Sequence, residues 1–271
     1  MSLGSRKSTN SNTTLPSHSD RTIRVMSYNV NFGLMLNEAP SPGAKTVLDA
    51  IKESNVEVCC MQETNQFYEQ YFEDELSDLY PFQFFRHSEN WYAGGVGVLS
   101  KYPIHEVHWI PSKHGWFYGS IIEIESPIGA IQMLNTHLRP SMDANSMIPT
   151  PMTFYRARND RLDDIQEWHK HLDQTKPTII LGDFNESYNG IYYGHAVHWL
   201  HEQSFGNSIL QHDPDTNTWV WPVSLGFTSI TLTAKFDHIF YHRDWFTCSE
   251  GKVLIQGDSD HRPVVATLHL K

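Results

Sequence analysis

The sequence predicts one α/β domain that fills almost the whole chain. Short apolar runs alternate with amphipathic stretches from about residue 23 onward, which is the pattern of strands interleaved with helices. No internal repeat or linker-like change of composition interrupts this pattern in the 271 residues. A length of about 250 residues is within the range of one large domain. We therefore expect a domain at 21–271, and a disordered tail at 1–20, where Ser, Thr and Asn predominate.

The first half of the domain begins with alternating strands and helices. An apolar run at 23–28 predicts a strand, and an amphipathic stretch at 44–54 predicts a helix. A second strand at 56–61 precedes an acidic helix that reaches about Leu79. Turns that contain Pro and Gly separate the next strands, which favours antiparallel neighbours. These strands are expected at 82–86, 95–100, 120–124 and 130–134.

The second half begins with a segment rich in proline. Residues 138–153 contain three prolines and predict a long loop, of the kind often found at a functional edge. A charged helix is expected at 155–172, a strand at 178–181 and a helix at 193–203. The closing strands are expected at 238–241 and 263–270.

The composition limits the class of protein and its partners. With 31 acidic and 20 basic residues the net charge is −11, so bulk charge does not favour binding to polyanions. The chain has no extended basic arm, and no apolar hairpin stands out as a membrane-docking element. No apolar run approaches the length of about 18 residues needed to span a bilayer. We expect a monomer without a transmembrane segment.

The cysteines indicate the redox environment. Three cysteines without CxxC spacing predict neither a disulfide framework nor a zinc site. Cys59 and Cys60 are adjacent in an apolar run, so a strand would direct them to opposite faces. We expect small buried side chains in a reducing compartment, with a cytoplasmic location as the default. Secretion stays open, since a signal peptide can have been removed.

Polar residues gather where the apolar strands end or begin. Four strands run into polar groups at their carboxyl ends, and the last two are preceded by them. If the last two strands run opposite to the other four, all six clusters lie on one edge of the sheet structure. The carboxylates are Glu63, Asp183, Asp237 and Asp260, and the accompanying side chains are Asn29, Asn31, Asn185, His137 and His261.

This set of residue types favours one chemistry. Four neighbouring carboxylates repel one another unless a cation joins them. Oxygen ligands select a hard ion such as Mg²⁺ or Mn²⁺. Amides can donate hydrogen bonds to phosphate oxygens, and a histidine paired with a carboxylate is a common acid, base or charge stabiliser. A single strand-end Asp or Asn is usually a turn former or a helix cap, but six clusters in this order predict metal-assisted phosphoester hydrolysis.

The order of these motifs resembles that of the endonuclease/exonuclease/phosphatase superfamily, which has the fold of pancreatic-type deoxyribonuclease. The resemblance extends from about residue 23 to residue 269 and is most specific in Gly182-Asp183-Phe184-Asn185 and Ser259-Asp260-His261. It implies a four-layer α/β sandwich, in which helices flank two packed mixed sheets. The remaining motifs are 27–31, Gln62-Glu63, Asn135-Thr136-His137-Leu138 and 236–239.

The resemblance also implies a role for each polar residue. Glu63 would be the principal ligand of Mg²⁺ or Mn²⁺, supported by Asn31 and Asp260. Some relatives carry Asp at the position of Asn31, so the neutral amide favours a single metal ion here. Asn29 and Asn185 would hold the phosphate, and Asp183 would orient or deprotonate the attacking water. Asp237 would pair with His261, which acts on the phosphoryl oxygens, and His137 would lie near the phosphate or the leaving group.

Three further residues are candidates for substrate binding. Trp219 and Trp221 share one face of an expected strand, where they either stack on a base or sugar or form a packed sheet face. Arg139 directly follows the His137 motif and contacts either a second phosphate or a carboxylate at the rim.

The sequence thus predicts a divalent-metal-dependent phosphoester hydrolase, in which activated water attacks a phosphodiester in line. Nucleic acid is one candidate substrate. An alternative is a phosphomonoesterase or a phospholipase-C-like enzyme that acts on small-molecule or lipid-headgroup phosphates. A catalytically silent module that binds a phosphorylated partner is the alternative from another class.

Overall fold

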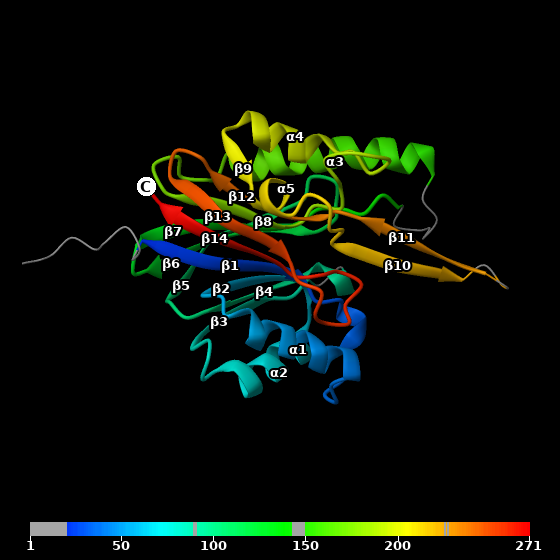
Figure 1. Cartoon of the computed structure of the whole chain (residues 1–271), viewed down its shortest axis with the longest axis horizontal. Helices are drawn as coiled ribbons and strands as arrows, with labels where there is room; N and C mark the ends of the chain where they lie inside the picture. The colour runs from blue at the N-terminus through cyan, green and yellow to red at the C-terminus, as the bar shows by residue number, and fades with distance from the viewer. Residues whose placement is uncertain (1–20, 89–90, 143–149, 225, 227) are drawn as a thin grey trace, which may run out of the picture.

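Two six-stranded sheets pack against each other in the computed structural model. The structure describes residues 21–88, 91–142, 150–224, 226 and 228–271. The tail expected at 1–20 and part of the loop expected at 138–153 lie outside these residues. Helices cover the outer face of each sheet, so the molecule has four layers (Figure 1). The predicted four-layer α/β sandwich is confirmed.

The first sheet has the strand order β13-β14-β1-β2-β4-β3. Its outer face carries the two helices α1 (Pro42–Ser54) and α2 (Gln66–Leu76) (Figure 1). The strands are β1 (Thr22–Asn29), β2 (Val58–Thr64), β3 (Phe82–Arg86), β4 (Gly95–Ser100), β13 (Phe246–Val253) and β14 (Val264–Leu270).

The second sheet has the order β5-β6-β7-β8-β12-β9, and α3 (Pro151–His169) and α4 (His195–Glu202) cover its outer face. The short α5 (Ser208–His212) directly follows β9. The strands are β5 (Ile104–Pro111), β6 (Tyr118–Ser126), β7 (Gly129–His137), β8 (Thr178–Asp183), β9 (Phe205–Asn207) and β12 (Asp237–His242).

Alternation along the strands divides the core into layers. Cys60 belongs to the cluster between the sheets, whereas the adjacent Cys59 packs under α1 and α2. Both thiols are fully buried, as expected for neighbouring residues of a central strand. Of the residues that the structure describes, no helix is long and apolar enough to cross a bilayer.

The strand directions bring the polar clusters together. β1 is parallel to β2 and β7 is parallel to β8, whereas β14 runs antiparallel to β1 and β12 runs antiparallel to β8. The carboxyl ends of four strands therefore meet the amino ends of the last two, which is the arrangement that gathers the six clusters at one edge. The strands are longer than predicted at this edge, so that Glu63, His137, Asp183 and Asp237 lie within the strand ends rather than beyond them.

The predicted boundaries differ most where capping or exposure decides them. Helix α3 begins at Pro151 instead of residue 155, because the Thr150 side chain caps it and proline suits the first turn. Strands β5 and β13 were not predicted. Both are edge strands with exposed polar residues and a β-bulge, so their apolar alternation is broken.

A hairpin formed by β10 (Trp219–Ser224) and β11 (Ser229–Ala234) is a separate two-stranded sheet. It projects beyond the body of the molecule (Figure 1). The sequence predicted no apolar hairpin that stands out as a membrane-docking element, and the structure contains a hairpin with an apolar face. In β11 the apolar residues alternate with Ser and Thr, and they share this face with Trp219, Trp221 and Val223 only when the two strands pair.

Candidate active site

Three neighbouring strands place three catalytic candidates side by side. In the strand register His137 of β7 lies opposite Asp183 of β8, and Asp183 lies opposite Asp237 of β12. All three side chains are buried. Gly182 makes the close approach of β7 and β8 possible, because a Cβ there would lie 1.9 Å from the Thr136 carbonyl oxygen. Its φ of +149° is also rarely adopted by other residues.

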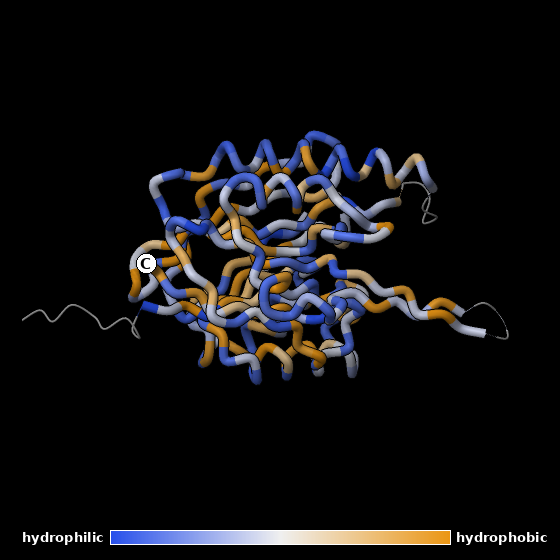
Figure 2. Tube along the Cα trace, turned by 45° about the horizontal axis from the view of Figure 1, so that its top comes forward, coloured by the Kyte–Doolittle hydropathy of each residue, from blue (hydrophilic) through white to orange (hydrophobic). Residues whose placement is uncertain are grey.

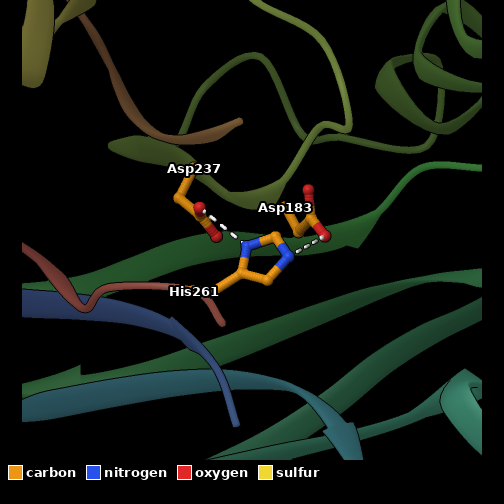
Figure 3. A group of neighbouring side chains, drawn as sticks. All are labelled: Asp183, Asp237 and His261. Carbon is orange, nitrogen blue, oxygen red and sulfur yellow. Dashed lines mark hydrogen bonds and ion pairs between the residues drawn. The ribbon is translucent and has the colours of Figure 1, made fainter. Parts of the chain in front are cut away.

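His261 lies between two carboxylates (Figure 3). Its Nδ1 is 2.9 Å from Asp237 Oδ2, and its Nε2 is 3.6 Å from Asp183 Oδ2. Burial by itself lowers the pKa of His261, but the charges of Asp237 and Asp183 and the hydrogen bond to Asp237 raise it well above its usual value. We therefore treat the imidazole as a cation held between two carboxylates.

Thr218 fixes the position of Asp237, which the sequence did not indicate. Its hydroxyl oxygen accepts hydrogen bonds from the backbone N–H groups of Phe236 and Asp237, at 2.9 and 3.0 Å. Thr218 is fully buried just before the β10–β11 hairpin. Nothing in the residues around Thr218 distinguishes it from an ordinary loop threonine, so only the three-dimensional structure reveals this contact.

Asn29 links the two sheets at the site. Its side-chain amide donates to Glu63 Oε1 at 3.0 Å and to Asp183 Oδ2 at 3.1 Å. The Asn185 amide donates to Asp183 Oδ2 at 3.2 Å and to the Leu138 carbonyl at 2.9 Å. Both amides thus point toward the Asp183 carboxylate, and each has its hydrogens engaged by acceptors of the protein itself.

The Glu63 carboxylate is partly accessible to solvent, with 18% of its side chain exposed. Its neighbours are N–H donors, since Asn29 and the backbone N–H of Phe32 both point to it. Burial is the main cause that raises the pKa of Glu63 to about 7, and the charges of Asp260 and Asp183 add to it. A divalent cation would stabilise the ionised form, so the residues present fit the predicted metal ion.

The other two predicted metal ligands, Asn31 and Asp260, contact each other. The Asn31 amide donates to Asp260 Oδ1 at 2.7 Å, and the Trp219 indole donates to Asp260 Oδ2 at 3.1 Å. Asn31 Oδ1 also accepts from the Gly33 N–H. Their oxygens are therefore engaged in local hydrogen bonds. Among the described His, Cys, Asp and Glu side chains, Asp183, Asp237 and His261 form a group whose ligand atoms all lie within 4.8 Å of one another.

Three site residues adopt a left-handed backbone conformation that is uncommon outside glycine. Asn31, Glu63 and Asn185 have φ values of 57°, 59° and 51°. Such conformations cost free energy and persist where the surrounding structure enforces them, often at functional sites. Their coincidence with three of the predicted site residues strengthens the assignment of this edge as the candidate site.

His137 completes the buried part of the site. Its ring stacks on Phe117 with centroids 3.9 Å apart, and its Nε2 lies 3.6 Å from Asp183 Oδ2. Burial lowers the pKa of His137 to about 4. Unlike His261, this imidazole is neutral near pH 7.

Arg139 forms a salt bridge with Asp160 and donates to the Met142 carbonyl at 2.7 Å. Its guanidinium also lies over the Trp116 ring, 4.7 Å from the centroid. Of the two sequence interpretations the structure shows the salt bridge, and the contact with a second phosphate stays a prediction.

A pocket of about 420 Å³ opens beside Asn31 and Asp260. Trp221 and Arg262 line it together with residues of the 255–260 loop. Trp219 and Trp221 stack with centroids 6.3 Å apart, which confirms that they share a face of the strand. Arg262 was not among the predicted binding residues, although it directly follows the Asp260-His261 motif.

The fold and this edge define a class of protein, an α/β sandwich with acidic, amide and imidazole groups at one end of two sheets. A model of the Endonuclease/Exonuclease/phosphatase family matches residues 26–261, and the chain belongs to this family. Membership supports metal-dependent phosphoester hydrolysis in general terms. No curated protein matches the sequence significantly.

Solved structures share the fold at low sequence identity. An endonuclease/exonuclease/phosphatase from Beutenbergia cavernae is 19% identical, with a TM-score of 0.68 over 92% of this chain and 72% of that one. D. rerio TDP2, complexed with a single-strand DNA product, is 16% identical, with a TM-score of 0.67 over 92% and 100%. The human Nocturnin catalytic domain, with a bound sulfate anion, is 17% identical, with a TM-score of 0.62 over 93% and 95%.

Proposed function

We propose that this protein hydrolyses a phosphodiester with the help of a divalent metal ion. The observation that carries the proposal is the position of the His261 cation between Asp183 and Asp237, beside the Glu63 carboxylate. A cationic imidazole has no lone pair for a metal ion, so this group serves acid–base and charge-stabilising chemistry better than metal ligation.

Asp183 is the proposed base that orients and deprotonates the attacking water. Its burial raises the pKa of the carboxyl group, which makes the ionised form a stronger base than an exposed aspartate. Asn29, Asn185 and their bonds to Asp183 hold the carboxylate in one orientation. As the substrate binds, a phosphoryl oxygen takes the place of one protein acceptor on these amides.

His261 is the proposed stabiliser of the charge that builds on the phosphoryl oxygens. Asp237 keeps the ring protonated and oriented through the bond to Nδ1, and Nε2 is left to act toward the substrate. Asp237 is thus a positioning residue that acts through His261. The neutral His137 lies on the other side of Asp183, where it is proposed to contact the phosphate or the leaving group.

Glu63 is the proposed principal ligand of Mg²⁺ or Mn²⁺, with Asn31 and Asp260 close to it. The bound ion would supply Lewis-acid polarisation of a phosphoryl oxygen. Trp219 and Trp221 are proposed to contact the part of the substrate that lies in the adjoining pocket.

An activity panel tests the proposal. Bis-p-nitrophenyl phosphate, p-nitrophenyl phosphate, single-stranded DNA, abasic duplex, RNA, sphingomyelin and inositol phosphates are compared with Mg²⁺, with Mn²⁺ and with EDTA. We expect turnover of diesters that requires the metal. Turnover of monoesters alone would favour the phosphatase alternative. Metal binding without turnover of any substrate would favour the silent module, and turnover that persists in EDTA would contradict the metal requirement.

A further inference from the structure

The β10–β11 hairpin has one face that is entirely apolar. In the strand register Trp219 lies opposite Ala234, Trp221 opposite Leu232, and Val223 opposite Ile230. Directly opposed residues of an antiparallel pair share a face. The other face carries Val220, Pro222 and four hydroxyl residues, Ser224, Ser229, Thr231 and Thr233.

The apolar face is exposed along most of its length. The exposed fractions of Trp221, Ile230 and Leu232 are 45%, 45% and 37%. The inner end of the hairpin is held by backbone hydrogen bonds to residues 260–262, but among the described residues its strands join neither large sheet. A two-stranded ribbon by itself gains little stability in water. Figures 1 and 2 show the hairpin extending beyond the body, and in Figure 2 orange hydrophobic segments alternate with pale ones along it. A contiguous apolar surface of this kind marks a site of contact with something else.

This face is continuous with the candidate active site. Trp219, its innermost large residue, donates a hydrogen bond to Asp260, and Trp221 stacks on Trp219. Trp221 also lines the pocket that contains Asn31 and Asp260. Whatever covers the face therefore lies close to a group bound in that pocket. A strand of six residues makes the face about 20 Å long.

The charge of the hairpin decides between two classes of occupant. No Asp, Glu, Lys, Arg or His lies between Thr216 and Ala234. The nearest cations donate to backbone carbonyls, Lys235 to Asp213 and Thr216, and Arg262 to Asn217. A nucleic acid needs cations along its path to neutralise phosphates. A neutral apolar face with tryptophan instead suits the interface of a lipid bilayer.

We propose that this apolar face docks on a zwitterionic phospholipid bilayer and brings a phospholipid diester to the site. A phospholipid offers an apolar body and a phosphodiester within a short distance, which matches the face and the adjoining pocket. The net charge of −11 opposes anionic membranes. The substrate assignment rests on the proposed function, whereas the docking does not. In the reaction water adds to phosphorus and one P–O ester bond breaks, which gives a phosphomonoester and an alcohol.

Vesicle flotation of the full chain tests the docking. Phosphatidylcholine vesicles are compared with phosphatidylserine-rich vesicles in EDTA, so that binding is measured without turnover. The test variant is I230S/L232S. The control is L79S, because Leu79 is 38% exposed in the turn after α2, far from the hairpin in sequence, and receives the same kind of substitution. Circular dichroism and thermal melting establish that each variant is folded, and a single-stranded oligonucleotide is the competing ligand.

We expect the wild type and L79S to float with phosphatidylcholine vesicles more than with phosphatidylserine-rich ones. Loss of two exposed aliphatic side chains should weaken this binding about ten- to hundredfold in I230S/L232S. Absence of wild-type flotation, or equal flotation of the folded double variant, would overturn the docking. Oligonucleotide binding that I230S/L232S weakens, with vesicle binding unchanged, would assign the face to nucleic acid instead. The hydrolase proposal is tested separately, because it fails if the protein does not hydrolyse the soluble diester, whatever the result with vesicles.

Discussion

Asp183 and Asp237 are register partners on the antiparallel strands β8 and β12, and the His261 ring contacts both carboxylates. Two buried carboxylates this close would repel each other if both were ionised without a counter-charge. The imidazolium supplies that charge from the segment that follows Asp260 and precedes β14 of the other sheet. The packing of the two sheets therefore assembles the acid–base group, and the chemistry depends on their relative position.

Replacement of Asp183 by asparagine should abolish most of the turnover. D183N keeps the size of the side chain but removes the base, so kcat on a soluble diester should fall about 10²- to 10⁴-fold. Steady-state kinetics with Mn²⁺ measure the change. D244N is the control, since Asp244 is exposed in the turn between β12 and β13. A D183N rate within a few fold of the wild type would contradict the proposed role.

Removal of the metal ion and replacement of its proposed principal ligand, Glu63, should both reduce turnover. We expect EDTA to abolish turnover and added Mn²⁺ to restore it. E63Q should raise the half-activating Mn²⁺ concentration by about tenfold or more, because a neutral amide binds a divalent cation far more weakly than a carboxylate. Calorimetric titration of Mn²⁺ checks this directly. Glu53, exposed on α1, provides the control E53Q, whose Mn²⁺ requirement should equal that of the wild type.

His238 should make the fold less stable in mild acid. Burial lowers its pKa to about 4, and its ring bonds to Asn207 and to the Glu186 carbonyl. Between pH about 6.5 and about 4 the unfolded chain takes up a proton at this residue and the folded chain does not. The contribution of the neutral His238 ring to the free energy of unfolding is complete above pH 6.5. It decreases as the pH falls toward 4, by up to about 3 kcal/mol.

Urea unfolding at several pH values, compared between the wild type and H238Q, isolates this contribution from that of other titrating groups. The wild type should lose more free energy of unfolding than H238Q over this pH range. Parallel pH profiles for the two proteins would show that His238 is not the group responsible.

Gly182→Ala should destabilise the fold far more than Gly190→Ala. A Cβ at residue 182 would lie 1.9 Å from the Thr136 carbonyl oxygen, so β7 and β8 would have to separate. At residue 190 φ is also positive, +81°, but nothing lies within 4 Å of the added atom. We expect the free energy of unfolding to fall by about 1 kcal/mol in Gly190→Ala, from backbone strain alone. It should fall by at least about 3 kcal/mol in Gly182→Ala. Chemical denaturation measures both, and similar losses would contradict the steric argument.

Local patterns predicted two strands with their observed limits. These are β3 at 82–86, an edge strand rich in phenylalanine, and its buried neighbour β4 at 95–100, and turns bound both. The edge strands β5 and β13 and most of the β10–β11 hairpin were not found. Polar residues interrupt the apolar ones in β5, β11 and β13, and the strand conformation of all these segments depends on how they pair.

The candidate site was predicted as a set of residues but not as a set of contacts. The polar groups at strand ends identified Glu63, Asp183, Asp237 and the others, because such residues interrupt apolar strands at an obvious place. The bond of Thr218 to the Asp237 backbone and the salt bridge of Arg139 with Asp160 left no local signal. Each joins segments about 20 residues apart in the sequence that come together only in the tertiary structure.

The sequence by itself determined the class of fold and the kind of chemistry, because strand periodicity and the types of polar residue at strand ends are local properties of the chain. Only the tertiary structure decided which carboxylate faces which imidazole, since Asp183 and Asp237 belong to two strands of one sheet and His261 to the segment before β14 of the other. It also decided that Trp221, Ile230 and Leu232 share one exposed face. The register of β10 against β11 creates that face, and register depends on how two segments pair rather than on either segment alone.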